Sequence, residues 1–402
     1  MEHIGIPTVA FIGPTAGYRN IDKWSFAGGA ELYLYYFAET LSDLGYKVEI
    51  IQPWEKEESF SLPGLSGVNI RGVELPNILK TQIEFNFFWK RKLDLEKYDH
   101  IHFHNIAYAF PYAKKNMTGT CHGVGWDCPK NEIVISDTFY EKYLGSVKEK
   151  YLMYKVHYAL KNLNGILSVD NMLLKYVQMK EPQHRNKIEV VYNFVDDKLF
   201  DPEKVASAHN KYAYLKEDNQ LLILYPRNIS FIRGIHLILN SLMKLLERGF
   251  RNIKLIVTGT GPEETYAMNF IKNNGLSNFV HFAGHVDHFK DMPQLLSIAD
   301  IVVIPSYCSE GTSLSCLEAL SMAKPVVVTN IGGLTDIISH GENGLIAKPT
   351  SDDITVALSK LIQNEAYREK LCIAGRDSVI KKFSYQMWRE NIEHFVDRYF
   401  NH

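Results

Sequence analysis

Hydrophobic positions along the chain follow two spacings that alternate in both halves of the sequence. Short, β-branched apolar runs predict buried strands, and apolar residues three or four positions apart predict the helices between them. In the first half this pattern predicts strands at 9–12, 47–52, 100–103, 118–121 and 165–169, with helices at 29–44, 78–96 and 138–162. In the second half it predicts strands at 221–225, 254–258, 280–282, 301–305 and 325–329, with helices at 235–248, 293–298 and 314–322. Strands and helices that alternate through short connections indicate an α/β fold with parallel sheets.

The sequence predicts two domains, because 402 residues exceed what one ordinary hydrophobic core organises. A polar stretch at 196–219 interrupts the alternation and is expected to be the linker between them. We therefore predict a Rossmann-like domain at 1–197 and a second one at 217–380, facing each other across a central cleft. A final helix at 385–400 could pack back on the first domain. A cleft between two such domains is a common place for a ligand.

Composition narrows the class of protein. Hydrophobic residues make up 46% of the chain and charged residues 22%, which is typical of a globular protein. A formal net charge of −2 argues against nucleic acid as a general partner. No apolar run approaches the ~20 residues that span a bilayer, and no signal-peptide pattern precedes the first predicted strand. The five cysteines lack a C-x-x-C pair, so we expect reduced thiols and a cytoplasmic protein.

Two glutamates eight positions apart, Glu310 and Glu318, lie in the segment that is most informative about function. Glu310 falls in the loop after the strand predicted at 301–305, and Glu318 falls two turns into the next helix. Both carboxylates can therefore lie at the sheet edge where open α/β sheets bind ligands. The helix N-terminus near Thr312 and Ser313 offers free N–H groups to a phosphate. Together these groups suit a nucleotide sugar, although the glutamates taken alone could be a helix cap and a surface charge.

Basic and glycine-rich segments follow other predicted strand ends. Arg227 and Arg233 can grip a diphosphate with two guanidinium groups, or they can be ordinary surface arginines. Gly28 and Gly29 precede a long helix and would let the backbone approach a diphosphate, although a plain turn explains them as well. The loop at 259–262 lacks the third glycine of the dinucleotide fingerprint, which disfavours a dehydrogenase.

These segments occur in an order that resembles a known family. From Arg227 onward the motifs are Arg227…Arg233-Gly234, Gly259-Thr260-Gly261-Pro262, Phe282-Ala283-Gly284-His285-Val286, Glu310…Glu318, Lys324-Pro325-Val326-Val327, Gly332-Gly333-Leu334 and Asn343-Gly344-Leu345. The first half contributes Gly28-Gly29-Ala30-Glu31, Thr120-Cys121-His122-Gly123 and Val191-Tyr192-Asn193-Phe194-Val195-Asp196. The chain is similar in these motifs to the retaining glycosyltransferases of GT-B fold in the family 4 class, also called glycosyl transferases group 1.

The resemblance implies roles for individual residues. Glu318 would bind the ribose hydroxyls, and Glu310 would bind a hydroxyl of the transferred sugar. Arg227 and Arg233 would neutralise the diphosphate, and His122 would face the donor sugar near the reacting carbon. The backbone around Ser313, Leu314 and Ser315 would contribute to the diphosphate site, Gly28 and Gly29 would contact it from the first domain, and Gly284 and Val286 would border the base.

Three positions depart from the family pattern. Arg233 stands where lysine is usual, Ser313 often has glycine in its place, and Phe194 replaces a glycine after Asn193. The exchange at Ser313 bears on which sugar fits, and that at Arg233 alters the reach and geometry of the cation. The sequence alone gives no account of Phe194.

Two further features each have two interpretations. His100, His102 and His104 alternate along one strand, so they share a face that could bind zinc or could belong to the core. The segment 141–161 mixes lysines and tyrosines and could rest on an anionic membrane surface, or it could be a solvated helix face.

The resemblance implies a retaining transferase that moves a hexose from a nucleoside-diphosphate sugar, with a UDP-sugar favoured, to a carbohydrate or lipid-linked saccharide. It implies no metal and no other cofactor, because arginines and helix ends already serve the phosphates. An enzyme of this kind would work in the cytoplasm or at the inner face of the membrane. The alternatives are an inverting transferase or epimerase on the same fold, and a catalytically silent nucleotide-sugar-binding subunit.

Overall fold

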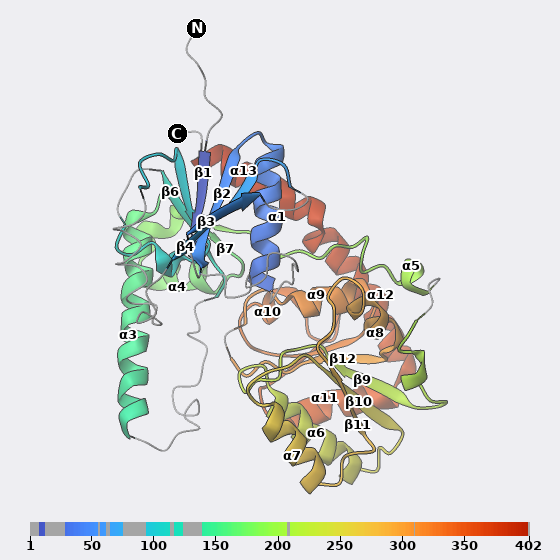
Figure 1. Ribbon diagram of the computed structural model, residues 1–402. Coiled ribbons are helices and arrows are strands. Elements are labelled where there is room, and N and C mark those ends of the chain that lie inside the picture. The colour runs from blue at the N-terminus through green and yellow to red at the C-terminus, as the bar shows by residue number, and fades with distance from the viewer. Residues whose placement is uncertain are drawn as a thin grey trace. The chain divides into compact units, whose positions relative to one another are not determined.

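The computed structural model describes residues 8–12, 29–54, 57–61, 65–74, 94–112, 116–123, 139–206, 210–308 and 310–400. These residues form two compact units, each built on its own sheet (Figure 1). The first unit holds described residues up to His122, those of 139–191 and those from Arg389 onward. The second unit holds Gly123 and those of 192–388.

The first unit contains an eight-stranded sheet in the order β3-β4-β2-β1-β5-β6-β7-β8. Its strands are β1 (Thr8–Ile12), β2 (Lys47–Trp54), β3 (Glu58–Ser61), β4 (Val68–Glu74), β5 (His100–Phe103), β6 (Met117–Cys121), β7 (Gly165–Ser168) and β8 (Ile188–Val190). Every neighbouring pair is parallel except β3 with β4. Its helices include α1 (Gly29–Asp43), α3 (Phe139–Asn162) and α4 (Met172–Lys180). The five strands predicted for this half are confirmed; β3, β4 and β8 were not predicted.

The second unit has a six-stranded parallel sheet in the order β11-β10-β9-β12-β13-β14. Its strands are β9 (Leu221–Tyr225), β10 (Ile253–Thr258), β11 (Val280–Gly284), β12 (Ile301–Ile304), β13 (Val326–Thr329) and β14 (Leu345–Ala347). Its helices include α5 (Pro202–Ala206), α6 (Ile235–Glu247), α7 (Glu264–Asn273), α8 (Met292–Ile298), α9 (Leu314–Ser321), α10 (Leu334–Ile337), α11 (Ser351–Gln363) and α12 (Glu365–Phe383). Counted from β9, this order is 3-2-1-4-5-6, the Rossmann arrangement.

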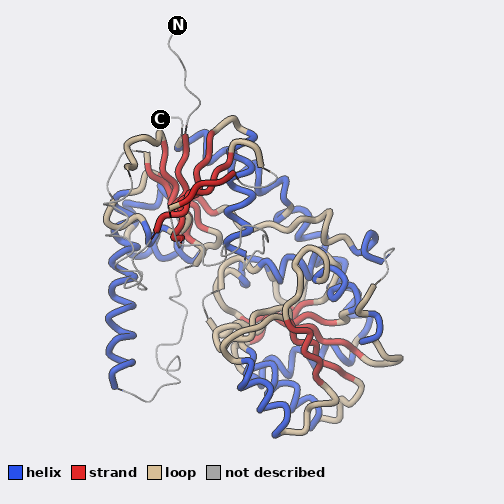
Figure 2. The backbone as a smooth tube through the Cα atoms, in the orientation of Figure 1, coloured by secondary structure: helices blue, strands red, loops and turns tan. Residues whose placement is uncertain are grey.

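Helices lie on both faces of the second sheet, as Figure 2 shows. Alternate strand residues therefore enter two different cores. Ile223, Tyr225 and Val303 belong to one buried cluster, whereas Leu224 and Val302 belong to the other. Burial on both faces explains why these strands read as continuous apolar runs rather than as alternating ones.

The described residues of 196–219, which we expected to be a linker, pack as part of the second unit. Phe200 and Leu215 are buried in the same core cluster as Leu222 of β9. The hydroxyl of Ser321 in α9 also donates a hydrogen bond to the carbonyl of Phe200 at 2.7 Å. The polar composition suggested a linker, but two apolar side chains are enough to anchor the segment.

Phe194, which the sequence left unexplained, is a core residue. Its side chain is buried, and its ring centroid lies 4.6 Å from that of Trp388 and 5.1 Å from that of Tyr385. Both partners belong to the final helix α13 (Tyr385–Tyr399). The side chain at position 194 therefore fixes the start of that helix, which a glycine could not do.

The later part of α13 belongs to the first unit. Arg389 forms an ion pair with Asp43 at 2.8 Å, and Arg398 forms one with Glu189 at 2.9 Å. Beyond the helix end, the ring of Phe400 stacks on His100 with centroids 3.6 Å apart. Most of the helix predicted at 78–96 lies outside the described residues.

Gly234 offers a test of how tightly the second unit is built. It has φ +78° and precedes α6, and a β-carbon there would sit 1.8 Å from the carbonyl oxygen of Pro305. We expect Gly234→Ala to destabilise the protein by at least about 4 kcal/mol, because backbone must move to admit the methyl group. The thermal unfolding midpoint of the purified variant measures this.

Gly275→Ala is the matched control. Gly275 has φ +66°, but a β-carbon there would meet no atom within 4 Å. Only the left-handed backbone then costs energy, about 1–2 kcal/mol. Equal losses in the two variants would show that the contact with Pro305 is unimportant.

Candidate active site

Arg227 and Glu310, two predicted site residues of the second unit, lie where the strand order of its sheet reverses. Arg227 follows the carboxyl end of β9, and Glu310 follows that of β12, which is the neighbour of β9. From β9 the chain builds outward to β10 and β11, and from β12 it builds in the opposite direction. Ligands of open α/β sheets bind at such a reversal point, outside the carboxyl ends of the strands.

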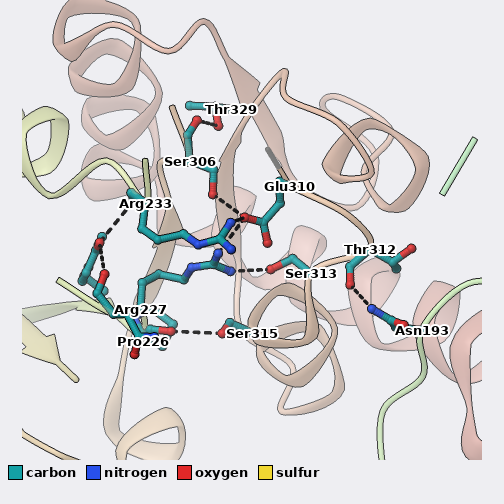
Figure 3. A network of polar contacts seen from close by, with 12 residues as sticks. Asn193, Pro226, Arg227, Arg233, Ser306, Glu310, Thr312, Ser313, Ser315 and Thr329 are labelled. Carbon is teal, nitrogen blue, oxygen red and sulfur yellow. Dashed lines mark hydrogen bonds and ion pairs between the residues drawn. The ribbon is translucent and has the colours of Figure 1, made fainter. Parts of the chain in front are cut away.

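Three donors converge on one oxygen of Glu310 (Figure 3). Arg227 Nη2 lies 2.6 Å from Oε2, Ser306 Oγ lies 2.8 Å from it, and Arg233 Nη1 also donates to it. Glu310 is only 6% exposed. Among the described residues, no hydrogen bond is recorded to the other carboxylate oxygen, so Oε1 keeps its acceptor capacity.

This network holds Glu310 in its ionised form. Burial by itself raises the pKa of the Glu310 carboxyl, because it penalises the charge. The guanidiniums of Arg227 and Arg233, together with the hydrogen bonds from Arg227 and Ser306, outweigh burial and lower the pKa below its ordinary value. Glu310 is therefore an anion at neutral pH and is a poor proton donor.

Arg227 also connects the site to the N-terminus of α9. Its Nη1 donates to Ser313 Oγ at 2.7 Å, and Ser315 Oγ donates to the carbonyl of Pro226 at 3.0 Å (Figure 3). The N–H groups of Leu314 and Ser315 lie in the first turn, where a helix provides no partner for them. The positive helix end and Arg227 thus lie side by side and favour an anion.

Glu318 lies in the second turn of α9, close to the same arginine. It is 5% exposed, and its Oε1 lies 3.7 Å from Nδ1 of His288. Burial raises the pKa of Glu318, while the charges of His288 and Arg227 oppose that shift. Because Arg227 acts electrostatically on both carboxyls, Glu310 and Glu318 lie in one region of the second unit.

His122 belongs to the first unit, directly after β6. Burial lowers the pKa of its imidazole to about 4, against a hydrogen bond to the backbone of His104 that raises it. The two rings lie 4.5 Å apart, and Nε2 of His122 is buried without a hydrogen-bond partner in the described structure. His122 is therefore neutral at pH 7, and the hydrogen-bonding capacity of its buried Nε2 is unused among the described residues.

The alternating histidines of β5 form part of the first unit's core. His100 Nε2 and His102 Nδ1 both bond to Thr118 Oγ1, at 2.8 and 2.9 Å, and His102 Nε2 bonds to Thr120 Oγ1 at 2.8 Å. All of these side chains are buried. Within the described ranges, no group of three or more metal-binding side chains is found.

The predicted glycines and Val286 lie apart from the network around Glu310 or outside the described residues. Gly29 is the exposed first residue of α1, and Gly28 lies outside the described residues. Gly284 ends β11 with φ +64°, and Val286 packs against the core of the second unit. In the part of the chain that the structure describes, no recorded contact joins Gly284 or Val286 to the network around Glu310.

One expectation from the sequence is wrong. Cys308 is disulfide-bonded, whereas we expected five reduced thiols; among the described cysteines, Cys121, Cys316 and Cys372 are free. Lys155, one of the lysines of 141–161, is 2% exposed, and its Nζ lies 5.0 Å from the ring centroid of Tyr151, so this lysine is buried rather than on a solvated face.

The sequence analysis missed two residues of this region. Ser306 directly follows the Ile-Pro end of β12, so its place at a strand end was a usable signal. His288 lies on the loop after β11, and nothing in the sequence pattern connects it with Glu318.

Comparisons with known proteins agree with this fold. Residues 208–378 match the family described as "Glycosyl transferases group 1", and residues 27–199 match "Glycosyltransferase Family 4". An uncharacterized glycosyltransferase of Methanocaldococcus jannaschii is 26% identical over 381 residues, which are 89% of this chain and 91% of that protein. The capsular polysaccharide biosynthesis glycosyltransferase CapM of Staphylococcus aureus is 28% identical over 253 residues, or 60% of this chain and 63% of that one.

Solved structures show the fold. Sucrose-phosphate synthase from Thermosynechococcus elongatus superposes with a TM-score of 0.78 at 16% identity, covering 98% of each chain. The HepE protein of Anabaena, in complex with UDP and glucose, gives a TM-score of 0.72 at 16% identity, covering 98% of this chain and 100% of that chain. The architecture is the GT-B fold of glycosyltransferases. With the two family matches, the chain belongs to the group 1, family 4 type of glycosyltransferase.

The bonds from Arg227, Arg233 and Ser306 to Glu310 predict that the stability of the folded protein depends on pH. Because its folded pKa lies below the ordinary 4.5, its stabilising contribution is complete above pH 4.5 and is lost as the pH falls through the folded value. Glu310→Gln leaves two arginines without their anion, at a cost of about 3 kcal/mol near neutral pH. We expect the unfolding midpoint to fall at pH 7, and the difference from the parent to shrink below pH 4.5.

Glu342→Gln is the control, since Glu342 is exposed and should change the midpoint little at any pH. A Glu310→Gln difference that stays constant from pH 7 to pH 4 would contradict the ion-pair explanation.

Proposed function

We propose that this glycosyltransferase moves a hexose from a nucleoside-diphosphate sugar, with retention of the anomeric configuration. The observation that carries the proposal is the cluster of Arg227, Arg233 and Glu310 beside the N-terminus of α9. Two guanidiniums and a positive helix end suit a diphosphate, and two buried carboxylates suit hydroxyl groups. A nucleotide sugar offers both kinds of group in one molecule.

The proposed catalysis is stabilisation of the leaving group. As the bond from the sugar to the diphosphate breaks, the diphosphate gains negative charge next to Arg227, Arg233 and the α9 N–H groups. Donors already aimed at a developing charge lower the barrier, and losing one costs about 3 kcal/mol, or ~100-fold in rate. No metal ion or other cofactor is needed in this scheme, because the cations and the helix end serve the phosphates.

Glu310 fits a binding role better than a nucleophilic one. Its Oε2 already accepts three hydrogen bonds, which stabilises the carboxylate and reduces its reactivity. Its Oε1 remains for a sugar hydroxyl. We therefore favour a same-face displacement, in which the departing phosphate accepts the proton of the acceptor. His122, neutral in the folded protein, would bind the sugar by hydrogen bonding rather than as a charged acid.

The names of two similar proteins bear on the donor and the acceptor. HepE is described in complex with UDP and glucose, and CapM is named for capsular polysaccharide biosynthesis. We propose a UDP-sugar as donor and a carbohydrate or lipid-linked saccharide as acceptor. Membrane contact, if the acceptor is lipid-linked, would involve the part of 141–161 other than Lys155. No helix of the described chain is both long and apolar enough to cross a bilayer.

Proton NMR of the product separates the retaining proposal from an inverting reaction on the same fold. The coupling constant of the new anomeric proton would show the donor's configuration if the proposal holds, and the opposite configuration if the enzyme inverts.

Nucleotide binding is tested by thermal unfolding with UDP, GDP, ADP and their sugars. A ligand at ~100 times its dissociation constant stabilises the folded protein by about 2.7 kcal/mol, which raises the midpoint measurably. We expect one nucleotide series to raise it in the parent protein. The increase should largely vanish in Glu318→Ala, because the buried carboxylate that binds the ribose is gone.

Glu342→Ala, which removes an exposed glutamate, should respond as the parent does. If a correctly folded sample responds to none of the nucleotides, the proposed nucleotide-sugar donor is wrong.

A further inference from the structure

We propose that His288 is a positioning residue for Glu318 and thereby sets the preference of the site for a nucleotide with ribose hydroxyls. The proposal rests on the proposed function, since it names a residue that acts on the nucleotide through Glu318. It comes from the contact between the loop after β11 and the second turn of α9, which the sequence did not reveal.

The Glu318 carboxylate can accept hydrogen bonds, but few groups of the protein hold it in one orientation. Its carboxylate is almost fully buried, and within the described part of the chain no hydrogen bond to it is recorded. His288 approaches it, with Nδ1 at 3.7 Å from Oε1. A buried carboxylate without fixed donors can turn about its last torsion. A neighbour on one side reduces that freedom and leaves the carboxylate ready for a pair of adjacent hydroxyls.

His288 is itself held in place. The backbone N–H groups of Phe289 and Lys290 donate to Asp287 Oδ1 at 3.0 and 2.8 Å, which closes the turn that carries the histidine. The N–H groups of Asp291 and Met292 donate to the carbonyl of Asp287 at 2.9 and 3.0 Å. The loop therefore enters α8 with a defined conformation.

Phe200 connects this loop to α9. Its ring centroid lies 5.5 Å from that of His288, and its carbonyl accepts a hydrogen bond from Ser321 of α9 at 2.7 Å. Ser321 and Glu318 are three residues apart and so lie on the same side of that helix. The segment around Phe200 thus fixes His288 relative to Glu318, and gives this part of the chain a function beyond connecting the two halves.

Electrostatic interactions with Glu318 also favour a role for His288 in holding the carboxylate. Burial raises the pKa of Glu318, and His288 and Arg227 are the two groups whose charges oppose it. Without His288, the carboxyl would be more readily protonated and freer to rotate. A protonated, rotating carboxyl accepts two hydroxyl hydrogen bonds less well than a fixed carboxylate.

The test compares UDP with 2′,3′-dideoxy-UDP by titration calorimetry in the parent, His288→Ala and His288→Asn. The parent should bind UDP ~10–100-fold more tightly than the dideoxy compound, because hydrogen bonds to a charged group are involved. In His288→Ala this ratio should fall by at least about 5-fold, through weaker binding of UDP alone. His288→Asn should restore most of it, since the asparagine amide can donate from nearly the position of Nδ1.

Equal weakening of UDP and dideoxy-UDP binding in His288→Ala would mean that His288 merely supports the loop. An unchanged ratio of the two affinities would mean that His288 does not act on Glu318. Either result overturns the proposal.

If GDP or ADP binds in place of UDP, the same comparison is made with the dideoxy form of that nucleotide. If the parent binds none of the three, the proposed function fails and this inference falls with it. If the parent discriminates and the variant does too, only the role of His288 is lost.

Discussion

The second unit depends on one buried carboxylate oxygen, Oε2 of Glu310, which accepts hydrogen bonds from Arg227, Arg233 and Ser306. Bringing two guanidiniums together costs free energy unless an anion lies between them. Glu310 supplies that anion, and in return the two cations keep it ionised. The site is therefore preassembled: its positive groups are placed before any phosphate arrives, and one carboxylate oxygen remains available.

The fold places these groups by rules that have little to do with their chemistry. Arg227 follows β9 and Glu310 follows β12, and these strands are neighbours because the strand order reverses between them. Gly234 brings the loop that carries Arg233 so close to Pro305 that a β-carbon would not fit. Ser313 and Ser315 then tie the start of α9 to the end of β9. Sheet order, a close backbone approach and a helix terminus together build one anion site.

Much of this could be predicted from the sequence, because the signals were local. Buried parallel strands such as β5 and β9 are continuous apolar runs and were predicted at the right residues. Arg227 and Glu310 follow strand ends, where ligands bind in this class of fold. The resemblance to group 1 glycosyltransferases, which the family matches confirm, supplied what spacing alone left open.

The rest depended on contacts between segments far apart in the chain. The contact of Phe194 with Trp388 explains why a large side chain occupies position 194. The burial of Phe200 in the core shows that the described residues of 196–219 are packed rather than a linker. The disulfide at Cys308 and the approach of His288 to Glu318 are further pairings that no periodicity encodes.

A crystal structure of the UDP complex tests the network of Arg227, Arg233 and Glu310 most directly. We expect a phosphate within hydrogen-bond distance of both arginines, and we expect Ser306 still to donate its hydrogen bond to Glu310 Oε2. A phosphate bound away from both guanidiniums would contradict the account.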